Sequence, residues 1–155
     1  KPLFIRFGKK PILNIHQQNQ KFEIGKSIIV SKGNDVTLLA IGETLPRAML
    51  ASQLLKKENI SSTLVSMHTL KPFDDEIFIK SIDKSKALVT IEEHSINGGL
   101  GEKCASIIAQ NNIQIPFKIL GIPDEYMING SQSDVLDYYD MSPEKICNIA
   151  KKMSK

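Results

Sequence analysis

The chain has 155 residues, of which 41% are hydrophobic and 24% are charged, and its formal net charge is +3 at pH 7. This length suits one domain with one hydrophobic core, and the proportions are ordinary for a globular protein. So small a net charge gives no reason to expect a nucleic acid or a membrane as partner. No apolar stretch approaches the roughly 20 residues of a membrane span, and the N-terminus does not resemble a secretory signal, so we expect a cytoplasmic protein.

The cysteines and histidines do not form a metal-binding pattern. Cys104 and Cys147 each fall on the apolar stripe of an expected helix, which favours reduced core thiols over a disulfide, a metal ligand or a nucleophile. The Cys and His spacings match no zinc site, and no G-x-S-x-G motif supports a serine hydrolase.

Strands and helices are expected to alternate along most of the chain. The apolar run V-T-L-L-A-I-G at 36–42 predicts a strand buried on both faces, and Thr44 is expected to cap the helix that follows. Alternation of this kind implies a largely parallel sheet with helices on both faces. The other expected strands are 27–30, 62–67, 87–93 and 117–122, and the other expected helices are 74–82, one carrying Leu100, Cys104, Ile107 and Ile108, and a last one capped by Ser142.

The first residues follow a different pattern. Leu3–Gly8 resembles a strand that ends abruptly, and residues 11–23 form a polar, aperiodic connection. We therefore expect Leu3–Phe7 to be the last strand of a preceding domain and His16, in the connection, to be a surface residue.

A glycine-rich turn lies within the stretch I-E-E-H-S-I-N-G-G-L-G-E-K at 91–103. Gly98, Gly99 and Gly101 fall where a strand gives way to a helix, and the N–H groups of such a turn could hold an anion. The spacing G-G-L-G is neither the dinucleotide nor the P-loop motif. A tight structural turn is therefore favoured, with phosphate binding as the alternative.

Glu92, Glu93 and His94 end the same expected strand, at the sheet edge where open α/β proteins commonly bind ligands. A carboxylate near an imidazole could transfer protons, but neighbours along a strand point to opposite faces. Glu92 and Glu93 therefore cannot both reach one substrate atom. We favour a role at a domain or subunit interface over direct catalysis, with a solvated strand end as the alternative. His68 falls at the same edge, before a turn in which Asp74 or Asp75 caps the next helix.

Arg6 is the better candidate for binding an anion. It ends an expected strand and is followed by Gly8 and two lysines. A guanidinium in such a cationic setting could grip a phosphate through two hydrogen bonds.

Four blocks in the sequence carry a family resemblance. They are G-N-D-V-T-L-L-A-I-G, S-M-H-T-L-K-P-F-D, V-T-I-E-E-H-S-I-N-G-G-L-G-E and L-G-I-P-D-E-Y, in that order between residues 33 and 126. Together they resemble the C-terminal domain of the transketolase family of thiamine-diphosphate enzymes. 1-Deoxyxylulose-5-phosphate synthase and the β chains of 2-oxo acid dehydrogenases share weaker versions of the same blocks.

The resemblance implies a fold and a division into domains. The fold would be a three-layer α/β/α domain with a five-stranded, mostly parallel sheet in which one strand is antiparallel. Residues 1–10 would be a remnant strand of a preceding pyrimidine-binding domain, 11–25 a linker and 26–155 the transketolase C-terminal domain.

The resemblance also implies a function in which this chain is one part. The intact enzyme would be a transferase that moves a two-carbon ketol unit between sugar phosphates. Its N-terminal and pyrimidine domains, on the same chain or a separate subunit of an expected homodimer, would hold thiamine diphosphate and magnesium. This chain would then carry no catalytic, cofactor-binding or metal-binding residue and would be inactive alone.

Individual residues acquire expected roles in the same way. Arg6 matches the arginine that grips the substrate phosphate, and Lys9 could assist it. Glu93 and His94 would lie at an interface or in the substrate channel. Two rival functions remain open: a deoxyxylulose phosphate synthase, with a decarboxylating first step, and a stand-alone regulatory module that binds an anion or nucleotide at the glycine turn.

Overall fold

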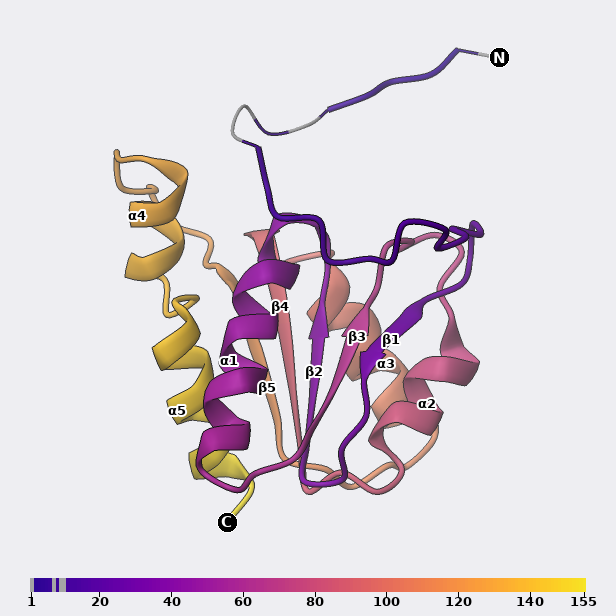
Figure 1. The fold of residues 1–155 in the computed structure, drawn as a ribbon. Helices are drawn as coiled ribbons and strands as arrows, with labels where there is room; N and C mark the ends of the chain where they lie inside the picture. The colour runs from indigo at the N-terminus through magenta and orange to yellow at the C-terminus, as the bar shows by residue number, and fades with distance from the viewer. Residues whose placement is uncertain (1, 7, 9–10) are drawn as a thin grey trace.

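A computed structural model describes residues 2–6, 8 and 11–155, and its helices and strands begin at Ile28 (Figure 1). The strands are β1 (Ile28–Ser31), β2 (Val36–Ala40), β3 (Ser62–Ser66), β4 (Ala87–Ser95) and β5 (Phe117–Ile122). The helices are the short 3-10 helix η1 (Gly42–Thr44), α1 (Leu45–Lys57), α2 (Asp75–Ile82), α3 (Leu100–Gln110), α4 (Gln132–Tyr138) and α5 (Pro143–Met153).

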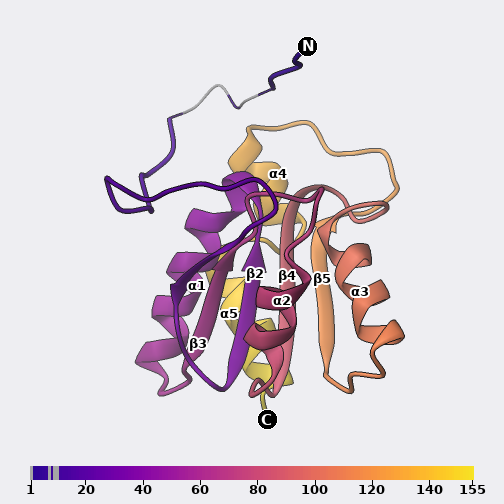
Figure 2. The same ribbon diagram turned by 90° about the vertical axis from the view of Figure 1, so that its right-hand side faces the viewer.

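The five strands form one mixed sheet in the order β1-β3-β2-β4-β5. β1 is antiparallel to β3, and the other neighbouring pairs are parallel. Helices α1 and α5 cover one face and α2 and α3 the other, so the molecule has three layers (Figure 2). The predicted α/β/α fold with a single antiparallel strand is therefore confirmed.

Alternation along the central strand β2 divides the core between the two faces. Leu38 and Ala40 belong to a cluster with residues of α1, α4 and α5, while Leu39 belongs to the cluster formed with α2 and α3. All three side chains are fully buried. Successive strand residues point to opposite faces, so a continuous apolar run can supply both layers at once.

The antiparallel strand β1 determines where the N-terminal segment lies. Ile28 pairs with Ser66, which ends β3, so β1 begins at the edge where the parallel strands end. Residues 11–27 lead to it along that edge, and the chain before them continues above it (Figure 1).

The expected strand Leu3–Phe7 is not seen. Residues 2–6 contain no helix or strand, and Phe7 lies outside the described residues. A strand requires a neighbour to complete its hydrogen bonds. The assignment of residues 1–10 to a preceding domain and of 11–25 to a linker stays a prediction.

Two of the predicted helix caps are confirmed and one is wrong. Asp74 accepts a hydrogen bond from the N–H of Ile77, and Ser142 accepts one from Lys145. Thr44 does not cap α1, because it already has helical backbone angles after η1, whereas a capping side chain needs an extended residue. Its Oγ1 instead donates to the carbonyl oxygens of Ile41 and Ile91, at 2.8 and 2.9 Å.

Both cysteines are free and buried, as predicted. Cys104 lies in the cluster under α2 and α3 and Cys147 in the opposite cluster, so the sheet separates them. Burial raises the pKa of both thiols, which keeps them protonated. Within residues 2–6, 8 and 11–155, every helix is too short or too polar to cross a membrane.

Candidate functional site

A polar groove of about 1090 Å³ follows the edge where the parallel strands end. The N-terminal segment makes one wall, with Arg6 and His16, and the ends of β3 and β4 make the other, with His68, Glu93 and His94. The structure therefore brings the three predicted site residues Arg6, Glu93 and His94 to one groove. Lys9, proposed as an assistant to Arg6, lies outside the described residues.

Glu93 is held in the groove by the turn that follows β2. Its Oε2 accepts the backbone N–H of Glu43 at 2.7 Å. Gly42 has a φ of +62°, and a Cβ there would lie 2.7 Å from Oε1 of Glu93, so this turn needs glycine. Burial raises the pKa of Glu93 despite the Glu43 hydrogen bond. Such a carboxylate can accept a ligand hydroxyl or exchange a proton.

Glu92 points to the opposite face, as predicted for neighbours on a strand. Its side chain is fully buried and accepts the N–H groups of Leu100 and Gly101 at 2.7 and 2.9 Å. The anion at the N-terminus of α3 is thus part of the protein itself. These N–H groups are occupied, which favours the structural turn over the phosphate-binding alternative.

His94 connects this buried carboxylate with the groove. Its Nδ1 lies 3.4 Å from Oε2 of Glu92 and 3.1 Å from the carbonyl oxygen of Ser95, while the ring is exposed. The imidazole can therefore meet a ligand or a partner surface, and the buried carboxylate supports its position.

Arg6 is exposed and faces Glu93 across the groove. Its positive charge opposes the rise in the pKa of Glu93, although it is the weakest of several influences. The chain passes directly beside the Glu43 carboxylate at Gly8, where a Cβ would overlap Oε1. The guanidinium of Arg6 thus stands at the groove mouth, where it could bind a phosphate through two hydrogen bonds.

The expectation that His16 is a simple surface residue is wrong. Its side chain is partly buried, and its Nε2 lies 3.4 Å from Oγ of Ser66. The reason is that the aperiodic connection packs along the sheet edge, a relationship that only the antiparallel pairing of β1 creates.

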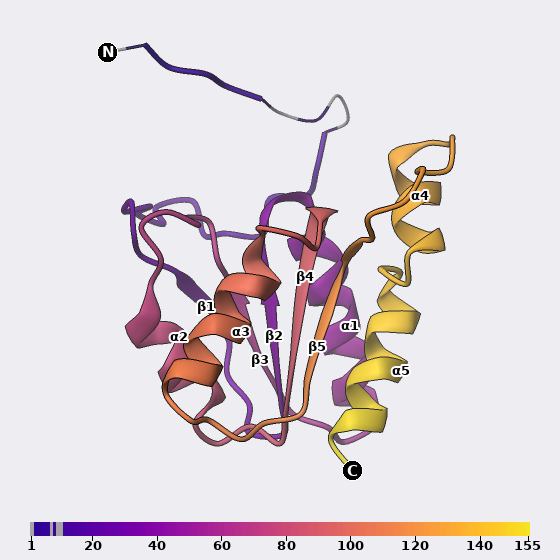
Figure 3. The ribbon, with the colours of Figure 1, turned by 180° about the vertical axis from the view of Figure 1, so that it is seen from behind.

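Helix α4 is an element that the sequence interpretation missed. It extends beyond the sheet edge in line with α5 (Figure 3) and carries Gln132 to the groove wall. Ser131 and Asp134 form a reciprocal capping box at its start. The spacing S-x-x-D was the available signal. It was obscured because the seven-residue helix carries little apolar periodicity.

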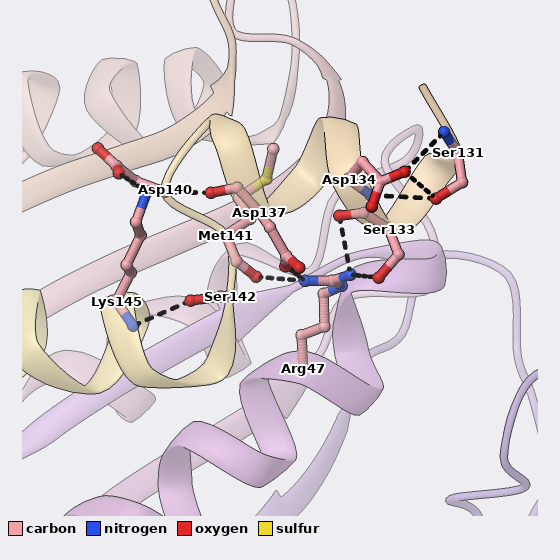
Figure 4. A network of polar contacts seen from close by, with 9 residues as sticks. All are labelled: Arg47, Ser131, Ser133, Asp134, Asp137, Asp140, Met141, Ser142 and Lys145. Atoms are coloured by element: carbon pink, nitrogen blue, oxygen red, sulfur yellow. Dashed lines mark hydrogen bonds and ion pairs between the residues drawn. The ribbon is translucent and has the colours of Figure 1, made fainter. Parts of the chain in front are cut away.

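Arg47, in the first turn of α1, ties α4 to the domain (Figure 4). It forms an ion pair with Asp137 and donates to the carbonyl oxygen of Met141 at 3.1 Å and to Oγ of Ser133 at 2.9 Å. One guanidinium therefore holds both ends of α4, and with them this part of the groove wall.

These features define an α/β/α domain of the kind that presents a polar groove at the carboxyl edge of a mixed sheet. Residues 25–146 match the family model for the transketolase C-terminal domain. The chain belongs to that family.

Relatives match nearly the whole chain. A Methanocaldococcus jannaschii protein, named as a transketolase C-terminal section, is 38% identical over 99% of this chain and 49% of its own length. One of the subunits of apulose-4-phosphate transketolase from Phocaeicola vulgatus is 30% identical, with the same two shares. A 1-deoxy-D-xylulose-5-phosphate synthase from Heliobacterium modesticaldum is 28% identical over 99% of this chain and 24% of its own length. The chain thus spans about half the length of the first two relatives.

Solved structures share the fold. A structure described as a split-gene transketolase, an inactive β4 tetramer, matches 91% of this chain and 46% of its own, with a TM-score of 0.83 and 29% identity. Transketolase from Campylobacter jejuni matches 83% of this chain with a TM-score of 0.61 and 18% identity, which shows the fold alone.

Proposed function

We propose that this chain acts as the C-terminal domain of a thiamine-diphosphate-dependent enzyme that transfers a two-carbon ketol unit between sugar phosphates. The observation that carries the proposal is the match over 99% of the chain to transketolase subunits and sections about twice as long. That match includes the N-terminal segment with Arg6, which precedes the part matched by the family model.

The cofactor would be held outside the described residues. Thiamine diphosphate supplies the electron sink for breaking and forming the carbon–carbon bond when it is bound. In the parts 2–6, 8 and 11–155, no three His, Cys, Asp or Glu side chains converge on a possible metal. The N–H groups of Leu100 and Gly101 are taken by Glu92. These residues do not fit a magnesium diphosphate, so we assign no cofactor-binding residue here.

The contribution of this chain would be to bind and orient. Arg6 would grip the phosphate of the sugar phosphate with its paired N–H donors. Glu93 and His94, across the groove from it, would line the substrate channel or contact a neighbouring domain. The N-terminal and pyrimidine domains, on the same chain or a separate subunit, would complete the site within a homodimeric parent enzyme.

The related enzymes remain the alternative. Deoxyxylulose phosphate synthases resemble the chain at 28% identity in one case and 35% in another, against 38% for the transketolase section. The order of these values supports ketol transfer, and a 2-oxo acid dehydrogenase β chain is the more distant possibility. The stand-alone anion-binding module is the weakest alternative, because Glu92 occupies the donors that it requires.

An activity assay with and without the missing domains tests the proposal. The 155-residue chain alone should neither bind thiamine diphosphate in calorimetry nor transfer ketol units. Combined with the cofactor-binding domains of its own parent protein, it should yield an enzyme that transfers ketol units between sugar phosphates. Pyruvate-dependent synthesis of deoxyxylulose phosphate would favour the rival enzyme, and ketol transfer by the chain alone would refute the proposal.

A further inference from the structure

Three aromatic rings join the connecting segment to the end of β3. The ring of Phe22 is edge-on to the rings of His16 and His68, with ring centroids 4.9 and 5.0 Å apart. His16 also reaches Ser66, and the neighbouring Ile15 packs against the core cluster beneath α1. The segment is therefore docked on the sheet edge although it contains no helix or strand.

A second anchor holds the other end of the segment. The N–H and Oγ of Ser27 both donate to Oδ2 of Asp74, at 2.7 and 3.1 Å. Asp74 is itself fixed by capping α2. His16 is the anchor nearer to Arg6, and only ten residues of chain separate the two. The orientation of Arg6 at the groove thus depends on whether His16 stays docked.

We propose that His16, Phe22 and His68 form an aromatic clasp that positions Arg6 at the groove, and that protonation of His16 opens it. The two histidines are positioning residues, because they contact Phe22 and Ser66 and reach a ligand only through the chain that leads to Arg6. The effect on substrate binding rests on the proposed function, whereas the opening of the clasp does not.

The electrostatics of the clasp give the direction of the pH effect. Burial, and to a lesser degree the charge of His68, lower the pKa of His16 from its ordinary value of 6.5. Neutral His16 therefore stabilises the docked segment, and this contribution is complete above pH 6.5. It declines as the pH falls below 6.5 and is gone below the lowered pKa of the docked state.

The surroundings of His68 make a second positive charge costly. Its Nε2 is buried and has no hydrogen-bond partner among the residues that the structure describes. A buried polar atom of this kind is poorly solvated when the charge near it rises. The other charged or titratable groups that face the groove are Arg6, Glu43, Glu93 and His94.

Nuclear magnetic resonance of the isotopically labelled chain tests the clasp without any activity measurement. Between pH 8 and pH 5, the wild-type backbone amides of residues 12–24 should change from rigid to mobile, with the same midpoint as the His16 imidazole signals. That midpoint should lie below 6.5. His16→Gln, which stays neutral, should remove the pH dependence, and Phe22→Ala should leave the segment mobile at both pH values.

A matched control separates the clasp from a general response of the groove. His94→Gln changes another groove histidine outside the clasp, so it should keep the wild-type transition. The clasp is refuted if residues 12–24 are equally rigid at pH 5 and pH 8, or if His16→Gln shows the wild-type transition.

Kinetics of the assembled enzyme test the consequence for Arg6. Between pH 8 and pH 6, KM for a phosphorylated acceptor should rise about threefold or more in wild type relative to His16→Gln, with kcat nearly unchanged. The comparison at each pH cancels the titration of the substrate phosphate, whose second pKa is about 6. Equal KM profiles would refute the positioning role. A spectroscopic transition in a protein without ketol transfer would leave the clasp standing and refute the proposed function instead.

Discussion

The carboxylate of Glu92 accepts the backbone N–H of Leu100 at 2.7 Å and so closes the N-terminus of α3 from inside the core. The same carboxylate accepts the N–H of Gly101 at 2.9 Å. A helix N-terminus favours a negative charge, and its first N–H groups otherwise lack partners. The end of β4 and the start of α3 are therefore one structural unit.

Glu92→Ala should destabilise the domain strongly. The change leaves two N–H groups without their acceptor and opens a cavity, so the free energy of unfolding should fall by about 3 kcal/mol. Denaturant unfolding measures it. The matched control is Glu102→Ala, since the exposed Glu102 carboxylate accepts only the N–H of Gly98. The control should cost less than about 1 kcal/mol, and equal losses would contradict the assigned role of Glu92.

Burial of Glu92 also predicts a pH dependence. Desolvation raises its pKa above the ordinary value of 4.5, although the two N–H groups and His94 oppose the rise. The native state then holds this proton more tightly than the unfolded state. Glu92 should therefore contribute a decrease in stability as the pH rises from 4.5 through its native pKa. Carboxyl ¹³C shifts should give a midpoint above 4.5, and a midpoint below it would be contrary to this reading.

The two neighbouring glycines of the turn should respond differently to alanine. A Cβ on Gly99 would overlap Oε2 of Glu92, whereas one on Gly98 meets nothing within 4 Å, although its φ is +75°. Gly98→Ala should cost about 1 kcal/mol through backbone strain. Gly99→Ala should cost about 3 kcal/mol, because it also displaces the buried carboxylate. Thermal unfolding compares the two, and the reverse order would disprove the steric explanation.

Arg47→Ala should loosen α4. Loss of its bonds to Asp137, Met141 and Ser133 should lower the free energy of unfolding by about 1–2 kcal/mol and speed amide exchange in α4. Hydrogen exchange read by mass spectrometry measures the local effect. Lys145→Ala removes an exposed pair with Asp140 and should cost about 0.5 kcal/mol. If the two variants exchanged α4 equally, Arg47 would not be its tether.

The sequence predicted the architecture better than the contacts at its edge. Continuous apolar runs such as 36–40 identify strands buried on both faces, and strand alternation separates Glu92 from Glu93. Those features are local, so periodicity reveals them. The seven-residue helix α4 escaped because a capping box without apolar repeats is a weak signal.

The groove itself depends on pairing that no local pattern reveals. Arg6 and His16 come to the groove only because β1 runs antiparallel to β3 and starts beside Ser66. The unusual use of Thr44, which binds the carbonyl oxygen of Ile91, depends on the same kind of long-range contact. Residue types therefore suggested the candidate site, and the topology placed its members together.

The most direct measurement concerns Arg6 in the assembled enzyme, and it compares KM for a phosphorylated acceptor with KM for its unphosphorylated analogue. Arg6→Ala should weaken binding of the phosphorylated acceptor by about 2–4 kcal/mol and leave the unphosphorylated one nearly unchanged. Arg6→Lys should recover only part of the loss, because an ammonium group cannot bind a phosphate through two fixed donors. An unchanged KM for the phosphorylated acceptor in Arg6→Ala would contradict the placement of this chain at the sugar-phosphate site.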